Sequence, residues 1–332
     1  MADIALRPRR SRLERRPTMT FLSESQTPAS DPREDAAPVG ALPAHRSAEE
    51  ILAHPDFPAA RRLFVAEHAK VYEAGTFPAQ LGADVGRVTT LAIIVCIYAA
   101  YDPADRETWP TLNRLKDHVA RFGFASPRLI DDFAARLAQT GYVEMERQPE
   151  DNRVRLLKPT ERLLDWDREW IAAHYAPLDL LYPEPGYGPP LRRDRAFQAA
   201  HAGAAPAAFD AIAAMMWVNL EIVFFLSATS ALIILLAFFE MGGADPDARI
   251  REGDIAHLAP RFGVSRTHIR NILTVAQERG FVVRSGPRNA FLHLTPRWMS
   301  AFDRFIADSL VQSDLTYRLA LRAMGIEAPY RS

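Results

Sequence analysis

The chain has 332 residues, 48% of them hydrophobic and 24% charged, which is typical of a globular protein of about two domains. Its formal net charge is −1, so no overall charge attracts it to nucleic acid, and any such binding must come from local patches. The single cysteine, Cys96, excludes an internal disulfide and a zinc site built from several cysteines, and it suits a reducing cytoplasm. The sequence carries no phosphate-binding loop, hydrolase elbow or metal-ligand spacing. We therefore expect a cytoplasmic protein that is not an enzyme and has no cofactor or metal site.

Residues 1–46 are rich in proline, serine, alanine and charge and have no apolar periodicity, which predicts a disordered tail. Within residues 1–16, six arginines stand against Asp3 and Glu14, which gives 6 − 2 = +4. A basic arm of this kind could bind phosphates. A solvated tail, or translation that begins at Met19, is the favoured interpretation. The segment has no long apolar core, so a secretory signal is not expected.

One block of sequence occurs twice. RFGFASPRLIDDFAARLAQTGYV begins at Arg121, and RFGVSRTHIRNILTVAQERGFVV begins at Arg261, so the two starts are 261 − 121 = 140 residues apart. A repeat of this length indicates a duplicated domain. We predict a first unit at residues 47–181, a Pro/Gly linker at 182–194 that contains YPEPGYGPP, and a second unit at 195–332.

Each copy predicts the same series of elements. An apolar helix is followed by a short helix, a Phe-Gly turn, a serine N-cap (Ser126 or Ser265), a second helix and two short strands around a polar tip. The apolar positions of the second helix are spaced by 3, 4 and 7 residues, which places them on one face. They are Ile130, Phe133, Ala134 and Leu137 in the first copy, and Ile269, Ile272, Leu273 and Ala276 in the second. The expected fold is mainly α with small β-hairpin wings (α+β), as tandem winged helix-turn-helix domains.

The first copy resembles the MarR-type winged-helix regulators through TGYVEMERQPEDNRVRLLKPTERL, in which Asp151-Asn152-Arg153 matches the D-x-R wing of that family. The second copy, with VSRTHIRNIL and RGFVV, resembles a recognition helix of the same type but lacks the D-x-R wing. The resemblance covers roughly residues 88–172 and 228–307. It implies a bacterial transcriptional regulator that is often ligand-responsive, with two winged domains joined by flanking helices. Because both copies lie on one chain, we expect an internal pseudo-dimer.

The charges of the two copies differ. Residues 261–288 carry six arginines and one glutamate (6 − 1 = +5), whereas residues 121–155 carry six arginines and six acids (6 − 6 = 0). Since phosphate contacts supply much of DNA affinity, we expect the second copy to be the main reader of double-stranded DNA. Its predicted DNA-binding residues are Ser265, Arg266, Thr267, His268, Arg270 and Asn271 on the helix, and Arg284 and Arg288 on the wing. The weaker candidates of the first copy are Arg128, Arg153 and Arg155, where Asp131 and Asp132 oppose phosphate.

Two other functions stay open at this stage. The chain could be a protein-interaction or assembly module whose winged helices no longer bind DNA. It could also be a membrane-attached regulator, since Ile222–Phe239 contains no charge, although we favour a buried core or dimer helix that Ser227 and Thr229 break by capping a helix start. A homodimer of the whole chain is also left open.

Aromatic residues of the flanking helices could line a pocket for a small-molecule effector of unknown identity, but interdomain core is the favoured interpretation. These residues are Trp166, Trp170, Trp217, Phe224, Phe225, Trp298, Phe302 and Phe305. We expect Cys96 to be a small core residue rather than a redox sensor.

Overall fold

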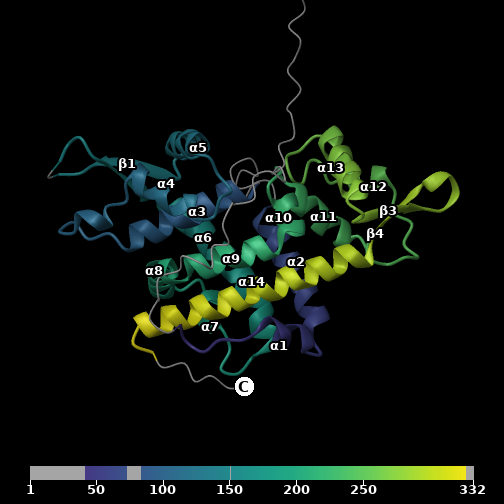
Figure 1. The fold of residues 1–332 in the computed structure, drawn as a ribbon, viewed down its shortest axis with the longest axis horizontal. Helices are drawn as coiled ribbons and strands as arrows, with labels where there is room; N and C mark the ends of the chain where they lie inside the picture. Colours follow the sequence, from purple (N-terminus) through teal and green to yellow (C-terminus); the bar gives the residue numbers. More distant parts are fainter. Residues whose placement is uncertain (1–41, 73–83, 150, 327–332) are drawn as a thin grey trace, which may run out of the picture.

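The computed structural model describes residues 42–72, 84–149 and 151–326. The protein is mainly helical and has two antiparallel two-stranded sheets, as expected for an α+β fold (Figure 1). In the first unit the elements are α1 (Ala48–Ala53), α2 (Phe57–Val71), α3 (Val85–Ala99), α4 (Leu112–Ala120), α5 (Pro127–Gln139), β1 (Val143–Arg147), β2 (Arg155–Pro159) and α6 (Glu161–Leu181). The predicted linker contains α7 (Gly188–Leu191). The elements of the second unit are α8 (Arg195–Ala204), α9 (Phe209–Val218), α10 (Leu220–Leu226), α11 (Ala231–Glu240), α12 (Glu252–Ala256), α13 (Arg266–Glu278), β3 (Val282–Ser285), β4 (Phe291–Leu294) and α14 (Pro296–Ala323).

The helix that follows the Phe-Gly turn forms as predicted in both units. Ser126 and Ser265 are the N-caps of α5 and α13, and each hydroxyl accepts a hydrogen bond from a backbone N–H of the first turn. Gly123 and Gly263, which precede these caps, have φ of 74° and 63°, values that favour glycine. All eight apolar positions predicted for the two helices are buried. The predicted hairpins are also confirmed, because β1 pairs with β2 and β3 with β4.

The two units repeat individual hydrogen bonds where the hairpin leads into the next helix. Thr160 Oγ1 donates to the carbonyl of Gly141 (2.8 Å), and Thr295 Oγ1 donates to that of Gly280 (2.7 Å). The strand that follows each hairpin tip also reaches back to the segment before α4 or α12. Leu157 N–H donates to the carbonyl of Pro110 (2.8 Å), and Leu292 N–H to that of Ile250 (2.9 Å). This matching geometry supports a duplication in structure as well as in sequence.

The helices outside the two hairpins pack reciprocally. α2 of the first unit packs along α6 and also against α11 of the second unit, while α8 of the second unit packs along α14 and also against α3 of the first unit. In Figure 1, α14 runs lengthways beneath both units, and α5 and α13 lie at the two ends of the same upper side. The two hairpins project outward from these ends.

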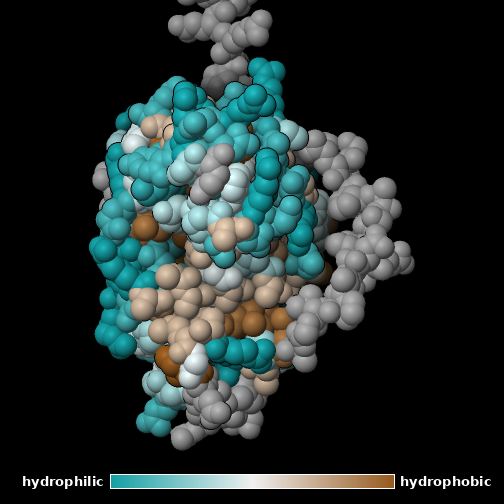
Figure 2. Space-filling model, turned by 90° about the vertical axis from the view of Figure 1, so that its left-hand side faces the viewer, coloured by the Kyte–Doolittle hydropathy of each residue, from teal (hydrophilic) through white to brown (hydrophobic). Residues whose placement is uncertain are grey.

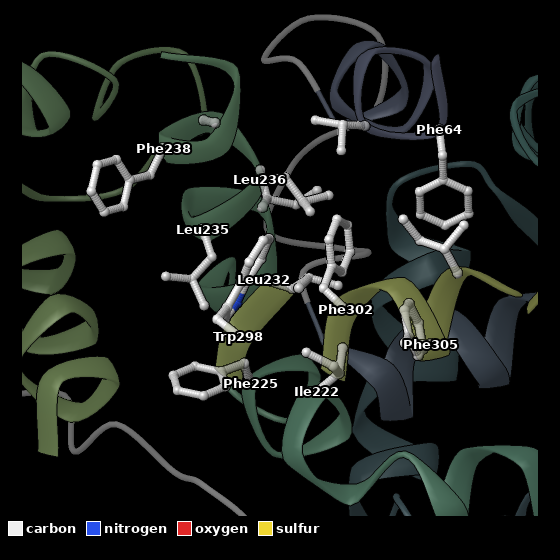
Figure 3. Packing of buried hydrophobic residues seen from close by; sticks show 14 of the residues in the cluster. Phe64, Ile222, Phe225, Leu232, Leu235, Leu236, Phe238, Trp298, Phe302 and Phe305 are labelled. Atoms are coloured by element: carbon white, nitrogen blue, oxygen red, sulfur yellow. The ribbon is translucent and has the colours of Figure 1, made fainter. Parts of the chain in front are cut away.

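The apolar run Ile222–Phe239 is broken at residues 227–230, near the predicted position, into α10 and α11. The predicted capping is wrong in detail. Ser227 Oγ donates to the carbonyl of Phe224 (2.6 Å) in the last turn of α10, and the residue before α11 is Ser230, which has φ 57° and makes no side-chain cap. Figure 3 shows the surroundings of the run: side chains of α10 and α11 lie around Trp298 and Phe302 of α14, and Phe305 of α14 and Phe64 of α2 belong to the same cluster.

Among the described residues, no single helix is both long and apolar enough to cross a membrane. One helix pair, residues 195–218 with 220–226, would pass by length and composition alone, and it is bent by 97°.

The segments predicted as tail and linker take part in the core where the structure describes them. The predicted tail lies outside the described residues up to residue 41, but Arg46 is buried and its backbone N–H donates to Asp314 Oδ2 of α14 (2.8 Å). In the predicted linker, Tyr187 is buried and its hydroxyl donates to Asp314 Oδ1 (2.8 Å). Arg318 Nε donates to the same carboxylate (3.1 Å). Asp314 therefore joins three separate stretches of chain.

Candidate nucleic-acid interface and central cavity

The polar face of α13 is exposed. Arg266, Thr267, Arg270 and Asn271 all face solvent on its first two turns, whereas the hydroxyl of Ser265 is used as the N-cap and accepts from His268 N–H (3.1 Å). The first turn of a helix presents unpaired backbone N–H groups and a partial positive charge, both of which favour phosphate. The exposed side chains thus stand where a nucleic-acid contact would be chemically favourable.

Glu252, at the start of α12, binds two of the predicted DNA-reading arginines. Arg270 Nε donates to Glu252 Oε1 (2.7 Å), and Arg284 donates to Glu252 Oε2 (2.8 Å) and to Gln277 Oε1 (3.0 Å). These two guanidinium groups hold the pKa of the Glu252 carboxyl below its usual range. The charge of +5 counted for residues 261–288 overstates the basic character of this surface, because Glu252 lies outside that range but faces it.

His268 is placed differently from the prediction. Its Nε2 is 2.7 Å from the carbonyl oxygen of Thr229, in the break between α10 and α11, and its ring is half-buried. Since a carbonyl can only accept, Nε2 carries the proton and donates. His268 therefore fastens α13 to the apolar core instead of facing outward with Arg266 and Arg270.

Arg266 and Arg288 make no ion pair within the part of the chain that the structure describes, and both side chains are exposed. Arg266 is the first residue of α13, and Arg288 is at the tip between β3 and β4, with a left-handed φ of 55°. A guanidinium group without an acidic partner needs no exchange of ion pairs to bind a phosphate. Of the predicted DNA-binding residues of the second unit, Arg266 and Arg288 are therefore the strongest candidates.

In the first unit, acids pair with the basic residues of the equivalent helix. Asp131 lies 2.6 Å from Lys116 Nζ of α4, and Asp132 lies 3.8 Å from Arg128. Each aspartate already has a basic partner, and Arg128 is partly neutralised. In the D-x-R turn, Asp151 accepts from the backbone N–H of Arg153 (3.1 Å), while its ion pair is with Arg106 (3.7 Å).

A basic cleft in the first unit was not predicted from the sequence. It has a volume of about 600 Å³ and lies between the start of α4 and the hairpin, where Arg153 and Arg155 meet Arg106 and Arg114. Glu107 and Asp117 also line it, and Asp151 pairs with Arg106, so the net charge of these groups is 4 − 3 = +1. The charge count began at residue 121 and left out Arg106 and Arg114. Figure 2 faces this end of the molecule: hydrophilic residues cover its upper part, and apolar residues gather in a band lower down.

A second site is a central cavity of about 290 Å³ that lies between the two units. Its wall comes from α2, α3 and α6 of the first unit and from α8, α9, α11 and α14 of the second. Of the eight aromatic residues considered for an effector pocket, Trp170 and Phe305 line this cavity. Trp298, Phe302 and Phe225 belong to the hydrophobic core, and Trp217 stacks on Phe124 (5.3 Å between ring centres).

The cavity gathers three histidines, His68, His174 and His201, with Cys96 and Asp167. Cys96 is buried on α3, as predicted, and burial raises the pKa of its thiol far above the usual range, which keeps it protonated. In the described ranges, no group of three or more histidine, cysteine, aspartate or glutamate side chains could hold a metal ion.

The buried histidines predict a loss of stability in mild acid. Burial lowers the pKa of His174 and of His201 to about 4. Burial also lowers the pKa of His68, and the neighbouring His174 lowers it further. A histidine in the unfolded chain has a pKa of about 6.5. Between about pH 4 and this value the unfolded chain binds more protons than the folded one, so the free energy of unfolding falls as the pH drops. Asp167 and Asp84 of the same wall oppose this, because burial raises the pKa of both, that of Asp167 to about 6, and protonation then favours the folded state. We expect the three histidines to outweigh the two carboxyl groups.

The urea midpoint should therefore be lower at pH 5 than at pH 7. The variant His174→Leu removes one of the three groups and should reduce that difference. Equal midpoints at the two pH values would mean that these histidines titrate alike in the folded and unfolded chain.

In comparisons with known proteins, no family model matches the chain, and no curated protein and no solved structure matches it. The interface and the cavity are therefore interpreted from the residues of this chain alone.

Proposed function

We propose that the chain is a transcriptional regulator that binds double-stranded DNA through two MarR-like winged helix-turn-helix units arranged as an internal pseudo-dimer. The observation that carries the proposal is the placement of α5 and α13, which lie at the two ends of one side of the molecule, each beside its hairpin (Figure 1). Two recognition helices related in this way can enter successive major grooves on one face of a duplex. A protein with this role would act in the cytoplasm, where bacterial DNA is.

The contacts refine which residues would bind. In the second unit, Arg266 and Arg288 would make the first phosphate or base contacts, while Arg270 and Arg284 are shared with Glu252. In the first unit, Arg114, Arg153 and Arg155 of the cleft would bind backbone phosphates beside the hairpin, while Arg106 is shared with Asp151. Both units thus contribute, and the first is more than a scaffold.

The alternative is a protein-interaction module. The observation in its favour is the number of cations that already have an acidic partner on these two faces: Arg270, Arg284, Lys116 and Arg128. A surface whose basic side chains already have acidic partners on the same protein needs no nucleic acid to balance its charge.

A fluorescence-anisotropy titration distinguishes the two. The full chain is titrated onto a duplex from the region upstream of its own gene and onto an unrelated duplex, each at two salt concentrations. We expect tighter binding to the upstream duplex, and affinity that falls steeply with salt because bound phosphates release counterions. No binding to either duplex at low salt would reject the DNA proposal and favour a protein partner.

Removing the acid that occupies the arginines should strengthen DNA binding. In Glu252→Gln, the ion pairs with Arg270 and Arg284 are lost and one negative charge leaves the interface, so we expect affinity to rise about fivefold, or ~1 kcal/mol. Stability should change by less than about 1 kcal/mol, since both pairs are partly exposed. The matched control is Glu278→Gln, at the far end of α13, which makes the same change in net charge and should have a smaller effect. Weaker binding by Glu252→Gln would show that Glu252 positions the arginines for DNA.

A further inference from the structure

Two buried histidines of the central cavity present hydrogen-bond acceptors to it. His68 Nδ1 is 2.8 Å from the carbonyl oxygen of Phe64, and His174 Nδ1 is 2.9 Å from that of Trp170. Because a carbonyl oxygen can only accept, both Nδ1 atoms must carry a proton and donate it. In a neutral imidazole the other nitrogen, Nε2, then has a lone pair and no proton.

The two Nε2 atoms face each other at 3.3 Å, and both rings line the cavity. Burial lowers the pKa of both rings, which keeps them neutral near pH 7. The pair therefore presents two acceptors side by side, and neither can satisfy the other. A single donor placed between them would bind to both.

Other groups of the lining are acceptors or have their hydroxyl protons already in use. Gln312 Oε1 is buried and has no hydrogen-bond partner among the described residues. The hydroxyls of Ser309, Ser313 and Thr316 donate to carbonyls of their own helix, α14. Asp84 and Asp167 are the carboxylic acids among the described residues of the wall, and no arginine or lysine is among them. Asp84 pairs with Arg87 outside the wall (3.3 Å), so the described lining offers an anionic ligand carboxylates but no cation of its own.

The remainder of the wall is apolar and aromatic, including Phe64, Tyr72, Trp170, Phe209 and Phe305. Trp170 and Phe64 also flank the histidine pair, at 4.7 Å from His174 and 3.8 Å from His68 between ring centres. The volume of about 290 Å³ is at the lower end of the range for ligand sites and suits a small planar molecule.

We propose that the central cavity is a binding site for a small, neutral aromatic molecule with one hydroxyl group, a phenol, which donates its hydrogen bond to the Nε2 atoms of His68 and His174. The apolar wall buries the ring, and the paired acceptors select the hydroxyl. This goes beyond DNA binding: the site is on the inner surface between the units, and its occupancy can be measured without DNA. Failure of either proposal leaves the other in place.

The test is calorimetric titration of the full chain near pH 7 with three probes of the same shape: naphthol, methoxynaphthalene and naphthoate. Naphthol offers a donor, methoxynaphthalene has the same rings without one, and naphthoate is an anion. We expect naphthol to bind about tenfold or more tightly than methoxynaphthalene, and naphthoate to give no measurable binding. Equal binding of naphthol and methoxynaphthalene, preference for naphthoate, or no binding of naphthol would each overturn the proposal.

Variants identify the acceptors. In His68→Leu and His174→Leu, the preference for naphthol over methoxynaphthalene should fall to near one, while methoxynaphthalene still binds and so reports an intact cavity. The matched control is His201→Leu, a third buried histidine of the same wall whose Nε2 is 3.2 Å from Thr316 Oγ1, which should keep the preference. Should the preference survive in both His68→Leu and His174→Leu, or vanish only in His201→Leu, the assignment of the paired acceptors would be wrong.

Discussion

Replacing Arg266 with alanine should weaken binding to duplex DNA by about 1–3 kcal/mol if the side chain reads a base. Arg266 is the first residue of α13, is exposed, and in the described part of the chain has no acidic partner to give up. If it binds a phosphate only, the loss of affinity should be equal on every DNA sequence. The slope of log affinity against log salt concentration should then decrease in magnitude by about 1. Anisotropy titrations of wild type and variant at two salt concentrations, on the upstream and the unrelated duplex, separate these cases.

The control for Arg266→Ala is Arg128→Ala. Arg128 lies in the first turn of α5, the equivalent helix of the first unit, but it is 3.8 Å from Asp132. Its removal takes away the same charge from a position that is already partly neutralised, so the loss of affinity should be smaller. A larger loss in Arg128→Ala than in Arg266→Ala would make the first unit the main reader.

Replacing Asp314 with alanine should lower the free energy of unfolding by about 3–5 kcal/mol. The Asp314 side chain is fully buried (0% exposed) and accepts from Arg46 N–H, Tyr187 OH and Arg318 Nε. Its loss removes the buried acceptor that these three donors share. The measurement is equilibrium denaturation in urea.

Two other variants test this explanation for Asp314. Asp314→Asn keeps one acceptor oxygen and the shape, so it should cost less than Asp314→Ala. Asp303→Ala breaks another ion pair of α14, the one with Arg61 at 2.7 Å, but this pair is partly exposed and should contribute about 1 kcal/mol or less. If Asp314→Ala cost no more than Asp303→Ala, the buried carboxylate would not be what joins the three segments.

The parts of the fold that the sequence predicted well are those set by local chemistry. The buried faces of α5 and α13 follow from the 3, 4 and 7 spacing, Ser126 and Ser265 cap the helices that directly follow them, and the strands of each hairpin are close in sequence. Each of these features depends on residues within about one helix or one turn of each other.

The parts that could not be predicted depend on partners that are distant in the chain. Arg270 meets Glu252 from 18 positions away, and His268 meets the carbonyl of Thr229 from 39 positions away. A count of charges along a segment cannot show which acid faces which base across two helices. The cavity was even harder to predict from the sequence, because His68 and His174 are separated by 106 residues and meet only once α2 has packed along α6.

The packing of the first helices against the last one has a consequence for synthesis on the ribosome. Arg46 and Asp314 are 268 residues apart, so at ~5–20 residues per second the segment before α1 waits roughly 13–54 s for its partner on α14. During this interval Ala48 and Ile51 of α1, which are buried in the folded chain, have no α14 to pack against. Folding of the nascent chain therefore cannot finish domain by domain. A premature stop before Pro296 would leave a product that is uncovered at its amino end and open to proteases.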